Sequence, residues 1–74
     1  MRVQIRLFAT LRQDRFKRRW LELPEGDSVA DLLRSLDIPA EDVGMLLFDG
    51  RDAALDTSLT TDTVISIFPA LGGG

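Results

Sequence analysis

The residues whose type and position suggest chemistry are the three glycines that close the sequence, Gly72, Gly73 and Gly74. At a glycine background of roughly 7%, three in a row at that place have a chance probability of roughly 0.03%. A segment without side chains can enter a narrow channel and lie against another protein's backbone. Extended, residues 69–74 would reach roughly 20 Å. A frayed end, a cloning remnant and a truncated chain are the alternative interpretations.

The group that such a tail presents is the α-carboxylate of Gly74. A carboxylate is a poor electrophile and reacts only after activation. Formation of an acyl-adenylate by an ATP-using partner supplies a leaving group, and attack by a thiolate or persulfide then gives a thioester or thiocarboxylate. None of these steps requires a catalytic side chain from this sequence.

Composition narrows the possible classes of function. The sequence contains no cysteine and no histidine, which excludes disulfides, thiolate nucleophiles, Cys/His zinc sites and histidine general bases. Its 74 residues suffice for one domain, with little room for an enclosed catalytic cavity. We therefore expect a carrier or binding protein, not an enzyme. It would hold no metal and no permanent cofactor.

Charge is unevenly distributed along the chain. The net charge is −3, but residues 12–19 carry five cations and one aspartate, a net of +4, so the remainder carries −7. This basic run, Arg12 to Arg19, is either a solvated hairpin end or a docking patch for an acidic partner or anionic ligand. A nucleic-acid partner is not expected, because the chain as a whole is acidic.

Hydropathy gives no indication of a membrane segment. No apolar stretch approaches the roughly 20 residues that span a bilayer. The first six residues alternate polar and apolar side chains, unlike the core of a signal peptide. We expect a cytoplasmic protein without a membrane partner.

Period-two patterns predict several strands. The first covers residues 2–8 and the second 17–23, with Leu21 and Leu23 inward and Trp20 and Glu22 outward. Residues 45–48 form a third strand, and Asp49-Gly50 predicts a type I′ turn into a short strand over 51–55. The last strand covers 63–68, with Ile65 and Ile67 inward, and Pro69 ends it.

One helix is predicted between the second and third strands. Ser28 is a helix N-cap, and Asp31 three residues later completes an aspartate version of the capping box. The helix covers residues 29–37, and its core-facing side chains follow the helical repeat: Val29, Leu32, Leu33 and Leu36. Pro39 interrupts it, and residues 39–43 form one further turn.

These elements predict an α+β fold. One main helix would pack on one face of a mixed sheet of four to five strands, with the two terminal strands adjacent at the centre. This is the order of the ubiquitin-like β-grasp fold. We expect a β-grasp domain over residues 1–68 and a flexible, reactive C-terminal tail over 69–74.

The sequence resembles the MoaD/ThiS family of sulfur carriers along its whole length, and the MoaD branch most closely. Two motifs carry the resemblance, together with the cap-and-helix segment 28–36. The opening motif is Phe8-Ala9-Thr10-Leu11-Arg12, and the closing motif runs from Phe68-Pro69-Ala70 to the glycines.

This resemblance implies activation by an E1-like MoeB/ThiF-type adenylyltransferase that uses ATP, and a thiocarboxylate on Gly74. It further implies insertion of the tail, through Gly72 and Gly73, into a MoaE-type catalytic subunit or another sulfur-acceptor enzyme. With MoaE the chain would form molybdopterin synthase, which adds dithiolene sulfur to cyclic pyranopterin monophosphate. Residues expected at the partner interface are Phe68, Pro69, Leu71 and Phe8, with Trp20 as a further candidate.

Some features depart from the family pattern. Pro69-Ala70 replaces a common Pro-Pro, Asp49-Gly50 replaces Asn-Gly, and the first connection is short. Other acceptor pathways therefore stay open: thiamine thiazole, cysteine, transfer-RNA thiolation, tungsten cofactor or protein modification. A ubiquitin-like protein modifier and a β-grasp interaction module with a passive tail are the alternatives of other classes.

Overall fold

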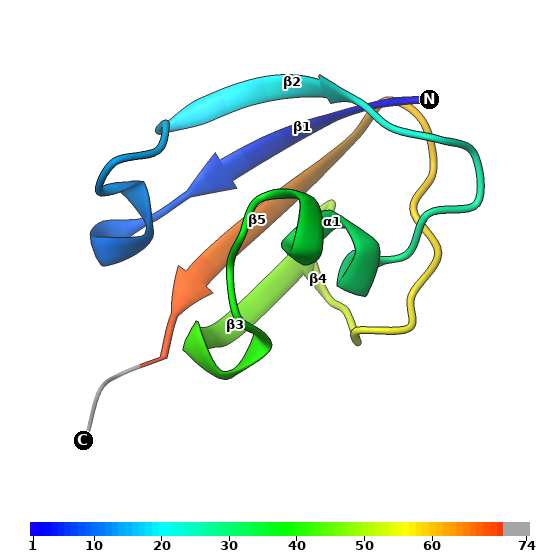
Figure 1. Cartoon of the computed structure of the whole chain (residues 1–74). Helices are drawn as coiled ribbons and strands as arrows, with labels where there is room; N and C mark the ends of the chain where they lie inside the picture. The colour runs from blue at the N-terminus through cyan, green and yellow to red at the C-terminus, as the bar shows by residue number, and fades with distance from the viewer. Residues whose placement is uncertain (71–74) are drawn as a thin grey trace.

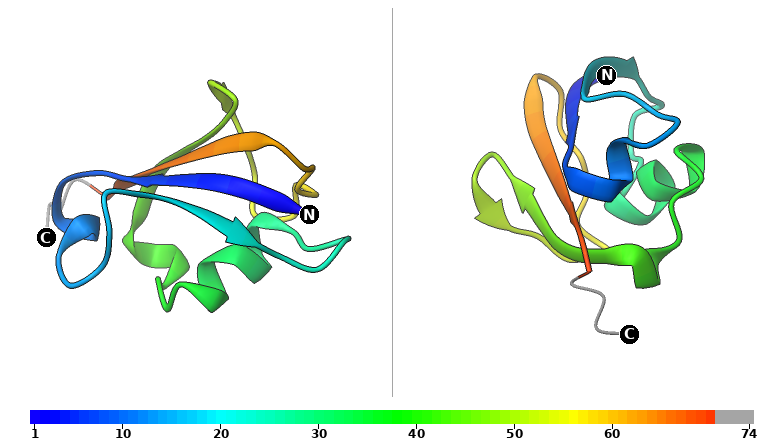
Figure 2. Two further views of the ribbon diagram at one scale, coloured as in Figure 1. Left: turned by 90° about the horizontal axis from the view of Figure 1, so that it is seen from above. Right: turned by 90° about the vertical axis from the view of Figure 1, so that its left-hand side faces the viewer.

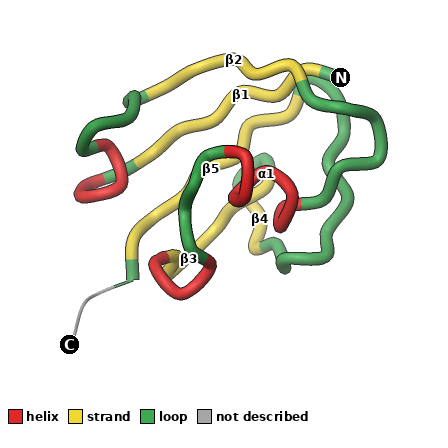
Figure 3. Tube along the Cα trace, viewed as in Figure 1, coloured by secondary structure: helices red, strands yellow, loops and turns green. Residues whose placement is uncertain are grey.

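A computed structural model describes residues 1–70 of the chain. The strands and the main helix follow one another in the predicted order (Figures 1 and 3). In chain order the elements are β1 (Arg2–Leu7), the 3₁₀ helix η1 (Ala9–Arg12), β2 (Arg18–Glu22), α1 (Val29–Ser35), the 3₁₀ helix η2 (Ala40–Asp42), β3 (Val43–Phe48), β4 (Arg51–Asp52) and β5 (Thr63–Pro69).

The strands form one mixed sheet in the order β2-β1-β5-β3-β4. The strands β1 and β5 lie side by side at its centre and run parallel, whereas the other neighbours are antiparallel (Figure 1). The predicted α+β architecture, a ubiquitin-like β-grasp, is therefore confirmed.

The core lies between this sheet and α1, which covers one face (Figure 2). The alternating side chains of β1 and β5 that point toward the helix are fully buried, as predicted for Ile65 and Ile67. Leu21 and Leu23 pack against the edge of the core. The buried apolar residues are Val3, Ile5, Leu7, Leu11, Val29, Leu32, Leu33, Ile38, Leu46, Leu59, Ile65 and Ile67.

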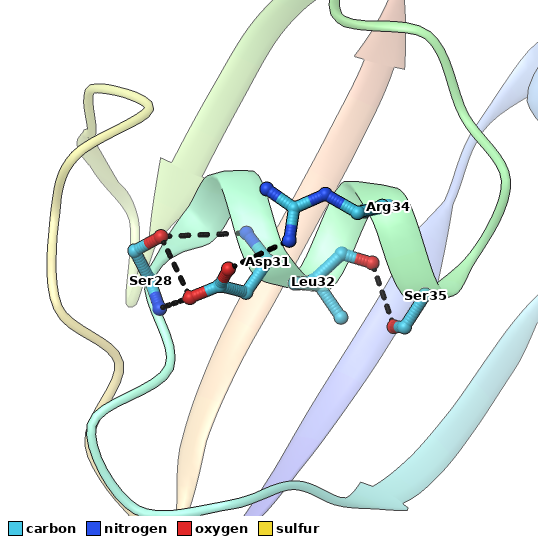
Figure 4. Close-up of polar contacts among 5 residues, drawn as sticks. All are labelled: Ser28, Asp31, Leu32, Arg34 and Ser35. Carbon is cyan, nitrogen blue, oxygen red and sulfur yellow. Dashed lines mark hydrogen bonds and ion pairs between the residues drawn. The ribbon is translucent and has the colours of Figure 1, made fainter.

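The start of α1 is fixed by the predicted capping box (Figure 4). The Asp31 backbone N–H donates to Ser28 Oγ at 3.3 Å, and the Ser28 backbone N–H donates to Asp31 Oδ2 at 2.9 Å. The Ser28 backbone N–H, then the Ser28 hydroxyl and then the Arg34 guanidinium donate to the Asp31 carboxylate and lower its pKa. The seven-residue helix depends on this cap because helices so short are marginal alone.

The predicted helix end at residue 37 was wrong by two residues. Asp37 takes a positive φ of 58°, which stops the helix after Ser35. The Asp37 N–H donates to the Arg34 carbonyl and the Ile38 N–H to the Leu33 carbonyl, which is the Schellman arrangement with aspartate where glycine is usual. Ile38 is thereby placed in the core beside Leu33.

The sheet boundaries also differ from the prediction. The strand β3 begins at Val43 instead of Met45, because a bulge at this end lets Val43 pair with Pro69. Pro69 is the last residue of β5 instead of the first residue beyond it. Its nitrogen faces the β1 side, as Ile67 does, where β1 has already ended, so no ladder bond is lost.

The short strand predicted over 51–55 is limited to Arg51–Asp52. Asp49 and Gly50 both have positive φ, which confirms the predicted turn. Beyond Ala53 the chain leaves the sheet and turns toward α1, where the Leu55 carbonyl accepts from the Ala30 N–H. The connection between β1 and β2 contains η1, which buries Leu11.

Among the helices of residues 1–70, none has both the length and the apolar character needed to traverse a bilayer.

Replacing the N-cap tests how far the short helix depends on it. We expect Ser28→Ala to lower the free energy of unfolding by about 1 kcal/mol, because the Asp31 N–H loses its acceptor. Chemical denaturation at neutral pH measures this change.

The matched control is Ser35→Ala at the other end of α1, where the hydroxyl donates back to the Leu32 carbonyl. Alanine favours the helix, so stability should hold or rise. Because folding lowers the pKa of Asp31, its contribution is present above about pH 4 and is lost as the pH falls through the folded value. The Ser28→Ala penalty should therefore shrink in acid, and equal losses for both variants would contradict the role of the cap.

Candidate functional site

The two central strands end at the same edge of the sheet. In the parallel register Leu7 lies beside Ile67, and the Phe8 N–H donates to the Ile67 carbonyl at 3.2 Å. Phe8 keeps an extended backbone, so it continues the line of β1 by one residue. Phe8 follows Leu7 and Phe68 follows Ile67, so the two phenylalanines are neighbours across the strand pair.

The rings of Phe8 and Phe68 stack on each other. Their centroids are 4.2 Å apart and the ring planes differ by 10°. Leu7 and Ile67 point into the core, and since side chains alternate along a strand, the two phenylalanines lie on the opposite face. Both rings are half-buried. The structure thus brings the two predicted interface aromatics together on the face that α1 leaves open. We call this pair the aromatic stack.

Met45 extends the apolar surface of the aromatic stack and was missed in the sequence. It pairs with Phe68 across β3 and β5, and 44% of its surface is exposed. The neighbouring Leu46 is buried, so alternation along β3 places Met45 outward. That alternation was present in the sequence as Met45-Leu46 within a predicted strand.

The chain leaves the sheet through Pro69 and Ala70, which we call the tail base. The Ala70 N–H donates to the Asp42 carbonyl at 2.8 Å. This bond ties the tail base to the end of η2. A surface hollow of about 460 Å³ adjoins it between η1 and η2, lined by Thr10, Leu11, Arg15, Glu41, Asp42, Pro69 and Ala70.

Gly44 allows the tail base to approach β3 closely. A Cβ atom at this position would lie 2.5 Å from the Pro69 carbonyl oxygen and 2.8 Å from Ala70 Cα. The φ of Gly44 is not in the left-handed region, so the requirement for glycine is one of space. This role depends on the bulge in β3, which the sequence pattern did not reveal.

Four of the predicted site residues lie outside the described part of the chain: Leu71, Gly72, Gly73 and Gly74. Among the others, Phe8 and Phe68 meet at one edge of the sheet, next to Pro69 of the tail base.

Trp20 lies apart from this group. It is on the same face and 48% exposed, but it pairs with Gln4 on β1. Gln4 is four residues before Phe8, about 13 Å along the strand. The Arg2 guanidinium covers the indole at 4.7 Å, and a hydrogen bond to Asp62 raises the pKa of Arg2. Trp20 is therefore engaged by its own chain.

The ThiS family model matches residues 5–74. No curated protein matches the sequence.

Solved structures share the fold over nearly the whole chain. SAMP1 from Haloferax volcanii is 21% identical, with complete coverage of both chains and a TM-score of 0.81. A Pyrococcus furiosus protein assigned as molybdopterin converting factor subunit 1 is 24% identical, with 96% of this chain and 99% of that chain covered and a TM-score of 0.79. A chain of the complex of molybdopterin-converting factor subunits 1 and 2 from Helicobacter pylori is 20% identical, with complete coverage of both chains and a TM-score of 0.68.

Substitution of Gly44 tests the spatial constraint at the tail base. We expect Gly44→Ala to weaken the bond between Ala70 and Asp42, so that the Ala70 amide exchanges with solvent faster. Overpacking should also lower stability by about 1–3 kcal/mol. Amide hydrogen exchange followed by NMR measures the first effect and denaturation the second.

Met45→Ala is the control, because it removes a neighbouring exposed side chain and leaves Gly44 unchanged. An Ala70 amide that exchanges equally in Gly44→Ala and in the unmodified chain would contradict the constraint.

A double-mutant cycle tests the coupling within the aromatic stack. For Phe8→Ala and Phe68→Ala we expect a coupling energy of about 0.5–1.5 kcal/mol, the range found for aromatic pairs. Chemical denaturation of the two single variants and the double variant measures it. The same cycle with Phe16 in place of Phe8 should be additive, since the Phe16 ring contacts Arg19 instead. Equal coupling in both cycles would contradict a specific stack.

Proposed function

Because the chain belongs to the ThiS family, we propose that it carries sulfur as a thiocarboxylate on Gly74 and delivers it to a biosynthetic enzyme. The family places it among ThiS/MoaD-type sulfur carriers and ubiquitin-like modifiers, which are small proteins of this fold. In the proposal the chain contributes a docking surface and a tail, and its partners supply the catalysis.

The observation that supports this proposal most directly is the arrangement at the end of β5. The central strand leads into the tail base, which is tied to Asp42 and pressed against Gly44. The aromatic stack lies beside it on the open face. A partner that docks on the stack therefore receives the following residues from a defined point. Because glycines 72–74 have no side chains, this end of the chain would be narrow enough to enter a channel in the partner.

The proposed chemistry proceeds in three steps. The Gly74 carboxylate attacks the α-phosphate of ATP, which gives an acyl-adenylate and releases pyrophosphate. A persulfide of a partner attacks the acyl carbon and displaces AMP, which gives an acyl disulfide. A thiol then cleaves the sulfur–sulfur bond, leaving the thiocarboxylate on the chain and a disulfide on the partner. An adenylyltransferase of the MoeB/ThiF type would catalyse the first step.

Within this function we propose molybdopterin synthesis as the acceptor pathway, with a MoaE-type subunit as the partner that takes the tail. The support is the resemblance of the opening and closing motifs to the MoaD branch. Two structural neighbours are, by their descriptions, subunit 1 of a molybdopterin-converting factor, one of them in complex with subunit 2.

A protein modifier is the second candidate function. Its support is the likeness in fold to SAMP1, a small archaeal modifier protein, over the full length of both chains. The same activated tail would then form an isopeptide with a target lysine. The chain has a single lysine, Lys17, so extended polymers are not expected.

Intact-mass spectrometry tests the carrier function. The purified chain is incubated with MgATP, a MoeB/ThiF-type adenylyltransferase from the same genome and a persulfide donor. We expect a product heavier by the difference between one sulfur and one oxygen atom. Without the persulfide donor, the adenylated chain should be observed instead.

The control is a chain that lacks Gly73 and Gly74, which should acquire neither mass. Addition of the MoaE-type subunit and cyclic pyranopterin monophosphate should return the chain to its starting mass as the dithiolene forms. Absence of any activated species with the cognate enzyme would refute the carrier function. Gly74 found linked to lysines of other proteins in cell lysate would favour the modifier.

A further inference from the structure

The basic run of residues 12–19 divides into two groups in the structure. Arg15 donates to the carbonyls of Leu11 and Asp37, and the Arg19 guanidinium stacks over the Phe16 ring at 4.6 Å. The other cations of the run are not used in this way. Together with the end of β1 and the residue after it, they line a surface hollow of about 420 Å³, which we call the basic hollow: Arg6, Leu7, Phe8, Arg12, Lys17 and Arg18.

The four cations of the basic hollow are not neutralised by the chain itself. In the part of the chain that the structure describes, the ion pairs join the N-terminus to Glu25, Arg2 to Asp62, and Arg34 to Asp31. None of them involves the hollow. The hollow is therefore a concentrated positive surface. The chain outside residues 12–19 carries a net charge of −7.

One pair within the hollow opposes the stability of the fold. Arg6 on β1 and Arg18 on β2 are direct cross-strand partners, so their side chains lie on the same face. Like charges directly opposite each other destabilise an antiparallel pair. A carboxylate bound between them would remove the repulsion, and the guanidinium group suits two-point binding of a carboxylate. An arrangement that costs stability in the free chain is typical of a functional site.

The position of the hollow relates it to the tail. Phe8 belongs both to the hollow and to the aromatic stack, and the stack lies next to the tail base. A protein that covers the stack and takes the tail must therefore lie over or beside the hollow. This favours a protein surface over a free anion as its occupant. Nucleic acid is disfavoured by the net charge of −3.

We propose that the basic hollow binds an acidic segment of the activating adenylyltransferase, with one carboxylate between Arg6 and Arg18 and a second near Lys17 and Arg12. The identity of this partner rests on the proposed function. The contact orients the chain on the enzyme and accelerates encounter, while the aromatic stack supplies apolar contact.

Charge reversal at Arg18 tests whether this side chain binds the partner or serves only to stabilise the fold. We expect Arg18→Glu to raise the KM of the chain in the adenylation assay by about tenfold or more, with kcat unchanged. Its melting temperature should hold or rise, because the introduced carboxylate would face Arg6 as an ion pair. A side chain kept only for folding would show the opposite, a lower melting temperature with an unchanged KM.

Two further variants serve as controls. Arg51→Glu makes the same charge change on β4, the edge strand on the opposite side of the sheet from β2. Its KM should match that of the unmodified chain. Arg18→Lys keeps the charge and should retain most of the affinity. The KM of the unmodified chain should rise with added NaCl, and that of Arg18→Glu should respond less. Equal effects of Arg18→Glu and Arg51→Glu would overturn the proposal.

A binding experiment without the enzyme keeps this inference separate from the proposed function. In an NMR titration with hexaglutamate, we expect shifts centred on the amides of residues 6–8 and 12–18, abolished in Arg18→Glu. If the unmodified chain is never adenylated, the proposed function fails while this titration still tests the hollow. Shifts that are absent, or that centre elsewhere, would overturn the assignment of the hollow to an acidic segment.

Discussion

The parallel pairing of β1 and β5 is the interaction on which the rest of the structure depends. These strands supply most of the large side chains that are fully buried, and their pairing brings together residues about sixty positions apart. Because the two strands are parallel, their C-terminal ends meet at one edge. The aromatic stack, the tail base and the basic hollow all lie there. An antiparallel pair would have placed Phe8 and Phe68 at opposite ends of the sheet.

A chain of 74 residues has little room for both a hydrophobic core and an enclosed catalytic cavity, and the fold is consistent with this. The helix α1 covers one face of the sheet and uses the apolar residues available for a core. The other face stays open and presents apolar and cationic side chains without cysteine or histidine among them. Such a surface suits recognition. In the proposed function, the reactive group is therefore carried on a segment that reaches into an active site built by another protein.

Features with a local cause were predictable from the sequence, and features caused by register were not. The capping box of Ser28 and Asp31 and the turn at Asp49-Gly50 need only a few adjacent residues, and both are confirmed. The helix end was misplaced because Asp37 adopts a conformation usually left to glycine. The role of Gly44 arises from a contact with the end of β5, and the Arg6–Arg18 pair arises from the register between β1 and β2.

The features with a local cause serve folding, whereas the Arg6–Arg18 pair, which is set by strand register, is better explained by recognition of a partner. At the start of α1, where the chain needs only to fold, local preference and tertiary structure agree. At the edge where the tail leaves the sheet they conflict, since Arg6 and Arg18 oppose each other across β1 and β2. The repulsion between these two arginines lowers the stability of the free chain, and an anionic group bound between them would relieve it. Selection for folding alone would disfavour this pair, so its location beside the tail base supports the proposal that a partner binds there.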